Sequence, residues 1–210
     1  MKNNQSGFTL VEIAIVLVII GLLLGGVLKG QELITQAKIK NVANDFNGMS
    51  AAVFGYQDRF KKFPGDDDQA EGRWGNTVTK NGDGNGSVGA TGVDAEVVCS
   101  STDNENCRFW QHLRLSGFVG GDTASKLAPQ NAGGGILQAQ NGALGLAGLT
   151  ICSTNLLGKI ANAIDAQFDD GKPATGQVRG AKMADKWDKA TTDTAYVDDG
   201  SQVYVICKSL

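Results

Sequence analysis

The chain has little of what most catalytic sites need. His112 is the single histidine among 210 residues and stands between Trp110 and Leu113 on a predicted helix, so we expect a packed or hydrogen-bonded imidazole rather than a general base. No serine stands in a strand–turn–helix elbow, and the glycines at 133–135 lack the lysine and serine of a phosphate-binding loop. The aspartates at 66–68 and 169–170 adjoin Gly or Pro turns and are expected to be solvated. An enzyme is therefore not expected.

The cysteines lack the spacing of a zinc site. There are four, separated by 7, 44 and 54 residues, so no C-x-x-C pair occurs. An even number beyond an apolar N-terminal segment is typical of disulfides in an oxidising compartment. Of the three pairings we favour Cys99–Cys107, which closes a polar loop, with Cys152–Cys207, which ties an apolar strand at 146–152 to the final strand at 203–207.

The chain also lacks an excess of positive charge. Its 19 Lys and Arg residues against 22 Asp and Glu residues give a net charge of −3. Overall, this balance argues against a nucleic-acid-binding surface. The sequence shows no internal repeat, and its length leaves room for about one globular domain after the N-terminal segment.

What the chain does have is a long apolar run near its amino terminus. Residues 8–28 contain one ionisable side chain, Glu12, and a helix of this length crosses a hydrocarbon core about 30 Å thick. In a removable secretory signal a small residue follows a shorter apolar region, whereas here Gly7 precedes the run. Lys2 favours a cytoplasmic amino end. The run is therefore predicted to remain as a transmembrane helix.

The hexapeptide GFTLVE at residues 7–12, followed by this helix, resembles the class III signal of type IV pilins and type II secretion pseudopilins. The resemblance implies that a prepilin peptidase cuts after Gly7 and methylates the new amino terminus at Phe8. Residues 1–7 would then be a cytoplasmic leader that is removed. Three further segments resemble recurrent features of a subgroup of bacterial pilin-like proteins: 63–66, 109–113 and 164–173.

Glu12 needs an explanation, because an acidic residue at the centre of a membrane helix costs roughly 2.5–3.5 kcal/mol on insertion scales. The resemblance implies that Glu12 pairs with the amine of Phe8 on an adjacent subunit and so sets the stagger of helices in a filament. The alternative is that its side chain snorkels to the cytoplasmic interface. We favour pairing, since ionisable residues within membrane segments usually mark function.

After the apolar run the pattern becomes amphipathic. Apolar residues recur every three or four positions and predict one stripe of a helix: Ile39, Val42, Phe46, Met49, Val53, Tyr56 and Phe60. The resemblance implies one long helix, with a membrane half at 8–28 and an amphipathic half at 29–60, packed on a small globular head at 61–210. The predicted fold class is α+β, pilin-like, with an antiparallel β-sheet. Gly25 and Gly26 weaken the helix. Their role is either to let the helix melt on assembly or to allow close packing against neighbouring helices.

Within the head, Pro64 and Gly65 end the long helix. The sequence then predicts a loop over 66–99, a short helix over 108–118 that ends before Gly117, and one or two apolar strands over 142–152. A second amphipathic helix is predicted over 155–168 and a final strand over 202–207.

Calcium is the one candidate ligand of a chain that otherwise needs no cofactor. Asn81, Asp83 and Asn85 alternate with glycines, as in the first half of an EF-hand loop. The match is partial, because Gly92 stands where a bidentate Glu is needed, and an Asn/Gly-rich surface turn explains the segment without an ion. A second acidic cluster lies where type II pseudopilins can bind calcium: Asp193, Asp198 and Asp199.

These features predict a structural subunit of a type IV pilus-like filament. We expect a single-pass protein of the bacterial inner membrane, with a cytoplasmic amino terminus and a periplasmic head, that joins an extracellular or periplasmic homo-oligomeric filament through its N-terminal helix. The implied partners are the prepilin peptidase, an inner-membrane platform protein and an ATPase. Two alternatives stay open: a type II secretion pseudopilin, and a minor tip pilin acting as an adhesion or DNA-binding module.

Overall fold

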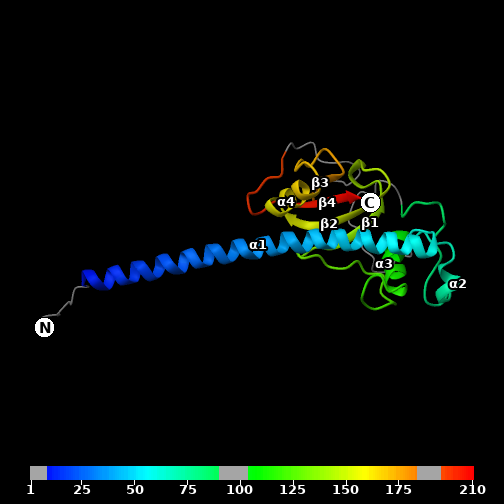
Figure 1. Cartoon of the computed structure of the whole chain (residues 1–210), viewed down its shortest axis with the longest axis horizontal. Helices are drawn as coiled ribbons and strands as arrows, with labels where there is room; N and C mark the ends of the chain where they lie inside the picture. Colours follow the sequence, from blue (N-terminus) through cyan, green and yellow to red (C-terminus); the bar gives the residue numbers. More distant parts are fainter. Residues whose placement is uncertain (1–8, 90–103, 184–194) are drawn as a thin grey trace, which may run out of the picture. The chain divides into compact units, whose positions relative to one another are not determined.

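The structure is a computed structural model of the chain and describes residues 9–89, 104–183 and 195–210. The chain divides into two units, Met1–Ala37 and Lys38–Leu210. Helix α1, Leu10–Phe60, contributes to both (Figure 1). The described part of the first unit is helical from Leu10, and the second unit is an α+β head.

The first part of α1 is apolar on every side. Large aliphatic side chains from Leu10 to Leu28 are exposed in the isolated chain, and an 18-residue window of mean hydropathy 2.8 has none of its residues buried. A helix that is apolar all round is stable only in lipid or against other apolar surfaces. By length and composition, α1 can cross a membrane.

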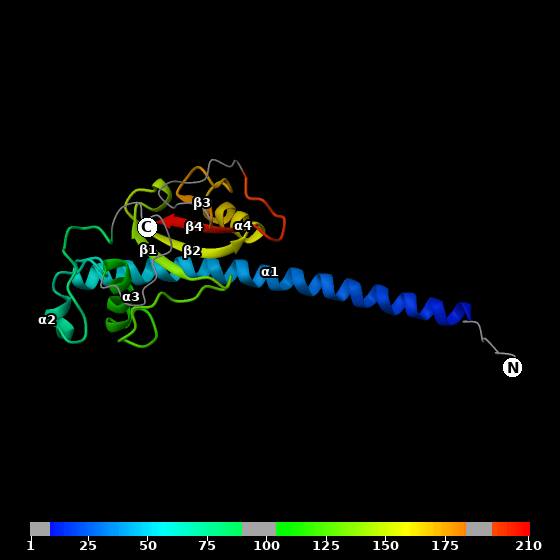
Figure 2. The ribbon, with the colours of Figure 1, turned by 180° about the vertical axis from the view of Figure 1, so that it is seen from behind.

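The second part of α1 shows the predicted amphipathic stripe. Val42, Phe46, Val53 and Tyr56 are almost completely buried and belong to one core with residues of the β-sheet. This part of α1, in cyan, runs along the sheet, as the two opposite views in Figures 1 and 2 show. The predicted packing of the long helix on the head is therefore confirmed.

The sheet has four strands in the order β1-β2-β4-β3, and every pairing is antiparallel. The strands are β1 Leu137–Asn141, β2 Leu149–Leu157, β3 Val178–Lys182 and β4 Val203–Ser209. Helix α4, Gly158–Phe168, shares a core with α1, where the Phe168 ring meets Phe46 edge-on at 6.0 Å. The predicted α+β fold with an antiparallel sheet is confirmed.

A disulfide joins Cys152 of β2 to Cys207 of β4, which are opposite each other in the strand register. This is the pairing favoured from the sequence. Cys99 lies outside the described residues, so the Cys99–Cys107 pairing stays a prediction. Cys107 itself is fully buried in the first turn of α3, Glu105–Leu115.

Several predicted element boundaries are wrong. Helix α3 begins at Glu105 rather than residue 108, because the Asn104 side chain accepts a hydrogen bond from the Cys107 backbone N–H and caps the helix earlier. Residues 155–157 extend β2 instead of starting the second helix. Residues 142–148, predicted as strand, form a turn with a short 3-10 helix, Ala143–Gly145, and the strand starts at Leu149.

Three elements are missing from the sequence-based prediction. Strand β1 carries buried Gln138 and Gln140, whose polarity hides the strand pattern. Strand β3 contains Gly180, against which the Tyr196 ring packs so closely that a side chain at position 180 would clash. Helix α2, Ala70–Trp74, is only five residues long and lies within the predicted loop.

Candidate functional site

Glu12 lies in the first turn of α1, where it closes a capping box with Thr9. Its Oε2 accepts hydrogen bonds from the backbone N–H and the hydroxyl of Thr9, both at 2.8 Å, and the Thr9 hydroxyl accepts one from the Glu12 N–H at 3.3 Å. This reciprocal pattern is the T-x-x-E signature of a helix start, and residues 9–12 carry that signature in the sequence. The cleavage and methylation residues Gly7 and Phe8 lie outside the described residues.

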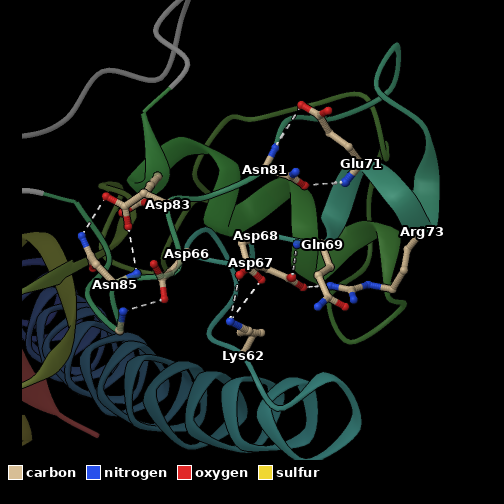
Figure 3. A network of polar contacts seen from close by, with 12 residues as sticks. Lys62, Asp66, Asp67, Asp68, Gln69, Glu71, Arg73, Asn81, Asp83 and Asn85 are labelled. Carbon is tan, nitrogen blue, oxygen red and sulfur yellow. Dashed lines mark hydrogen bonds and ion pairs between the residues drawn. The ribbon is translucent and has the colours of Figure 1, made fainter.

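The turn after α1 is built around Asp67, which is fully buried. Its carboxylate accepts hydrogen bonds from the Tyr56 hydroxyl at 2.6 Å and from the Gln69 N–H at 2.9 Å. It also forms an ion pair with Arg73 of α2 (Figure 3). One carboxylate thereby connects α1, the turn and α2.

The expectation that the aspartates at 66–68 are solvated is wrong for two of the three. Asp66 and Asp67 are 2% and 0% exposed, whereas Asp68 is at the surface and pairs with Lys62 at 3.1 Å. Asp67 has its partners within 11 positions of sequence, in α1, the turn and α2. Asp66 binds the Gly86 N–H, 20 positions away.

Asp66, Asp83 and Glu105 form a group of carboxylates. Each offers one oxygen, and these oxygens all lie within 4.8 Å of one another. Asp66 follows α1, Asp83 lies in a glycine-rich loop at residues 82–89, and Glu105 is the first residue of α3. Burial, together with the neighbouring charges of Glu105 and Asp83, raises the pKa of Asp66 to about 6.

Backbone groups fix the orientation of these carboxylates. Asp66 Oδ2 accepts a hydrogen bond from the Gly86 N–H at 3.0 Å, and Glu105 accepts bonds from the N–H groups of Asp83 at 2.9 Å and Gly89 at 3.0 Å. A cavity of about 490 Å³ opens beside the group, and Asp83, Glu105 and Arg108 are among the residues that line it.

The three residues predicted for calcium line one cavity, but hydrogen bonds already occupy the side-chain oxygens of Asn81 and Asn85. The Asn81 amide oxygen accepts a hydrogen bond from the Glu71 N–H at 2.8 Å, so it is engaged with α2 (Figure 3). Asn85 donates to the Asp83 carboxylate at 2.8 Å, and its own oxygen accepts the Ser87 N–H at 2.7 Å. Of the predicted set, only Asp83 belongs to the carboxylate group.

The C-terminal acidic cluster forms an ordinary turn where the structure describes it. Asp199 accepts hydrogen bonds from the N–H groups of Ser201 and Gln202 at 2.9 and 2.8 Å, and these bonds lower its pKa. Asp198 is exposed, and Asp193 lies outside the described residues. Within the described ranges, no group of three potential ligands forms here.

His112 is buried and hydrogen-bonded, as expected. Its Nδ1 accepts a hydrogen bond from the Gly65 N–H at 3.0 Å, and its Nε2 lies 3.2 Å from the Lys80 carbonyl. The two contacts together require a neutral ring with its proton on Nε2. Burial is the main reason that the pKa of His112 falls to about 4. The imidazole joins the turn after α1 to the following loop.

We predict that His112 stays neutral down to about pH 5. Because its folded pKa lies below the ordinary 6.5, the unfolded chain takes up the proton first. Its contribution to stability is complete above pH 6.5 and falls as the pH drops toward 4, by up to about 3 kcal/mol. Asp66, with its raised pKa, works in the opposite direction. A site-specific readout is therefore needed: ¹⁵N NMR of the His112 ring in the full chain in detergent. A titration midpoint above 6 contradicts the prediction.

Residues 2–28 match the family described as the prokaryotic N-terminal methylation motif. This motif is the class III signal peptide of type IV pilins and pseudopilins, as the hexapeptide predicts. It supports a prepilin of the type IV pilin and pseudopilin type, a class of structural proteins rather than enzymes. No curated protein and no solved structure matches the chain significantly.

Proposed function

We propose that this chain is a structural subunit of a type IV pilus-like filament, assembled through the first part of α1. The observation that carries the proposal is an apolar helix with no buried residue in its apolar window, directly behind the methylation motif. Such a helix is stored in lipid at little cost. In a filament core, the helices of neighbouring subunits cover the same surface again.

The amino end supplies the register between subunits. Cleavage after Gly7 frees an amine at Phe8, which the peptidase then methylates, and Glu12 presents a carboxylate one helical turn away. An amine from the adjacent subunit neutralises that carboxylate in the apolar core. The bonds from Thr9 to Glu12 support this role, because they hold the carboxylate at the amino end of α1.

The same features support the proposed location and partners. The subunit is held in the inner membrane with its amino terminus in the cytoplasm and its head in the periplasm, until a platform protein and an ATPase drive its extraction into the filament. Pseudopilins carry the same signal, so deletion of the protein distinguishes the two roles. Loss of long surface fibres supports a pilin, whereas failed secretion with intact fibres supports a pseudopilin.

The pairing role of Glu12 is tested by Glu12→Ala. We expect this variant to be processed and inserted normally, because the substitution removes a charge from an apolar segment. Filament incorporation, measured by immunoblotting sheared filaments against whole cells, should fall by at least about tenfold. Glu32→Ala, which removes an exposed glutamate paired with Lys29 in the same helix, is the matched control and should assemble normally.

Thr9→Val separates pairing from helix capping. It removes the hydroxyl that binds Glu12 and leaves the carboxylate in place. A defect confined to Glu12→Ala supports pairing between subunits. Equal defects in both variants assign Glu12 to capping alone, and wild-type filament levels in Glu12→Ala support snorkelling.

A further inference from the structure

The carboxylate group of Asp66, Asp83 and Glu105 has the spacing of a cation site. Two oxygens that bind the same calcium ion at about 2.4 Å can be at most about 4.8 Å apart. The oxygens that the three residues offer all lie within 4.8 Å of one another. The three residues therefore meet the spacing condition for ligands of a single ion.

Asp66 provides an independent sign of a ligand. Its side chain is 2% exposed, and its Oδ2 is bound to the Gly86 N–H. Its Oδ1 is buried and has no hydrogen-bond partner among the described residues. In Figure 3 this second oxygen points toward Asp83. A buried carboxylate oxygen without a partner is costly, and a cation between the carboxylates removes that cost.

The local charge fits a divalent ion. Three carboxylates and the guanidinium of Arg108, which lines the same cavity and donates to the Asn81 carbonyl, leave two negative charges. Like charges this close together repel one another, and the burial of Asp66 adds to the cost unless something neutralises them. The adjacent cavity of about 490 Å³ admits an ion together with the waters that complete its coordination.

We propose that Asp66, Asp83 and Glu105 bind one calcium ion. All three ligands are carboxylate oxygens, which favours calcium, magnesium or manganese over zinc or copper. Calcium fits best, because it tolerates irregular geometry, whereas magnesium demands near-ideal octahedral coordination. The ion joins the turn after α1, the glycine-rich loop and the start of α3. This ligand set differs from the one predicted from the sequence, which included Asn81 and Asn85.

The site is tested by calorimetric titration of the full chain in detergent micelles, after EGTA treatment and its removal, with calcium chloride. We expect one ion per chain with a Kd of about 10⁻⁴–10⁻³ M, the range of extracellular calcium modules. Titration with magnesium chloride should give much weaker binding. Calcium should also raise the midpoint of thermal unfolding, because the ion binds only the folded chain.

Three variants locate the ion. Asp83→Asn changes an exposed residue and is expected to fold. Asp66→Asn and Glu105→Gln each keep a carbonyl oxygen for one of their backbone hydrogen bonds. Each variant should weaken calcium binding by about tenfold or more, because affinity follows ligand charge. The matched control is Glu71→Gln, which alters a glutamate that also accepts a backbone N–H nearby but lies outside the group; its affinity should equal that of the wild type.

Two results overturn the proposal. One is the absence of saturable calcium binding by the wild-type chain at millimolar calcium. The other is unchanged affinity in Asp83→Asn, with loss of binding in Asp198→Asn or Asp199→Asn instead, which would place the ion in the C-terminal cluster. Neither result bears on filament assembly, so the site and the proposed function can fail separately.

Discussion

Gly7→Val is expected to leave nearly all of the chain as unprocessed precursor in the membrane. A prepilin peptidase must bring its catalytic groups against the backbone at the scissile bond, and glycine at position 7 leaves that approach open because it has no Cβ. A β-branched side chain there blocks it. Mass spectrometry of the amino terminus, on chain purified from membranes, distinguishes precursor starting at the leader from mature chain starting at Phe8.

Gly21→Ala is the control for a glycine substitution that does not touch the cleavage site. A Cβ added at Gly21 meets nothing within 4 Å, and alanine favours the helix by about 1 kcal/mol over glycine. This variant should be cleaved like the wild type. Normal cleavage of Gly7→Val, with a methylated Phe8 terminus, would show that the hexapeptide is not read as a prepilin signal.

The features that could be predicted from sequence depend on neighbouring residues. The apolar run, the amphipathic stripe through Val42 and Tyr56, and the hexapeptide are all local patterns, and each holds in the structure or in the family match. The Cys152–Cys207 pairing is predictable because both cysteines lie in short apolar strand patterns. The capping box of Thr9 and Glu12 is equally predictable, because it depends on two residues three positions apart.

The features that could not be predicted depend on contacts between distant segments. The carboxylates of Asp66 and Glu105 lie close together although they are 39 positions apart in sequence, and no periodicity predicts this contact. Strand β1 is not predicted, because Gln138 and Gln140 are buried in it. A half-buried strand usually alternates buried apolar residues with exposed polar ones. The run of aspartates beside Pro64 and Gly65 resembles a solvated turn, because the sequence does not show that Asp66 binds the Gly86 N–H 20 positions away.

Asp67→Ala is expected to destabilise the head strongly. The substitution leaves Arg73 without its ion-pair partner and the buried Tyr56 hydroxyl without its acceptor. Breaking a buried ion pair by removal of one partner typically costs 3–5 kcal/mol. The Arg73 side chain is 25% exposed and lies over the Phe60 ring at 4.6 Å, so solvent and ring screen part of its charge. We therefore expect a loss of about 3 kcal/mol in the free energy of unfolding.

Asp68→Ala is the matched control, because the neighbouring aspartate forms a surface ion pair with Lys62. Such pairs contribute about 0–1 kcal/mol. Urea unfolding of the full chain in detergent, followed by near-UV circular dichroism under non-reducing conditions, measures both variants. Tyr56→Phe, made in the wild type and in Asp67→Ala, isolates the contribution of the Tyr56 hydroxyl. The loss of stability caused by Tyr56→Phe should disappear when residue 67 is already alanine. If Asp67→Ala and Asp68→Ala lose equal stability, the buried carboxylate does not hold the end of α1 to α2, and core packing alone does.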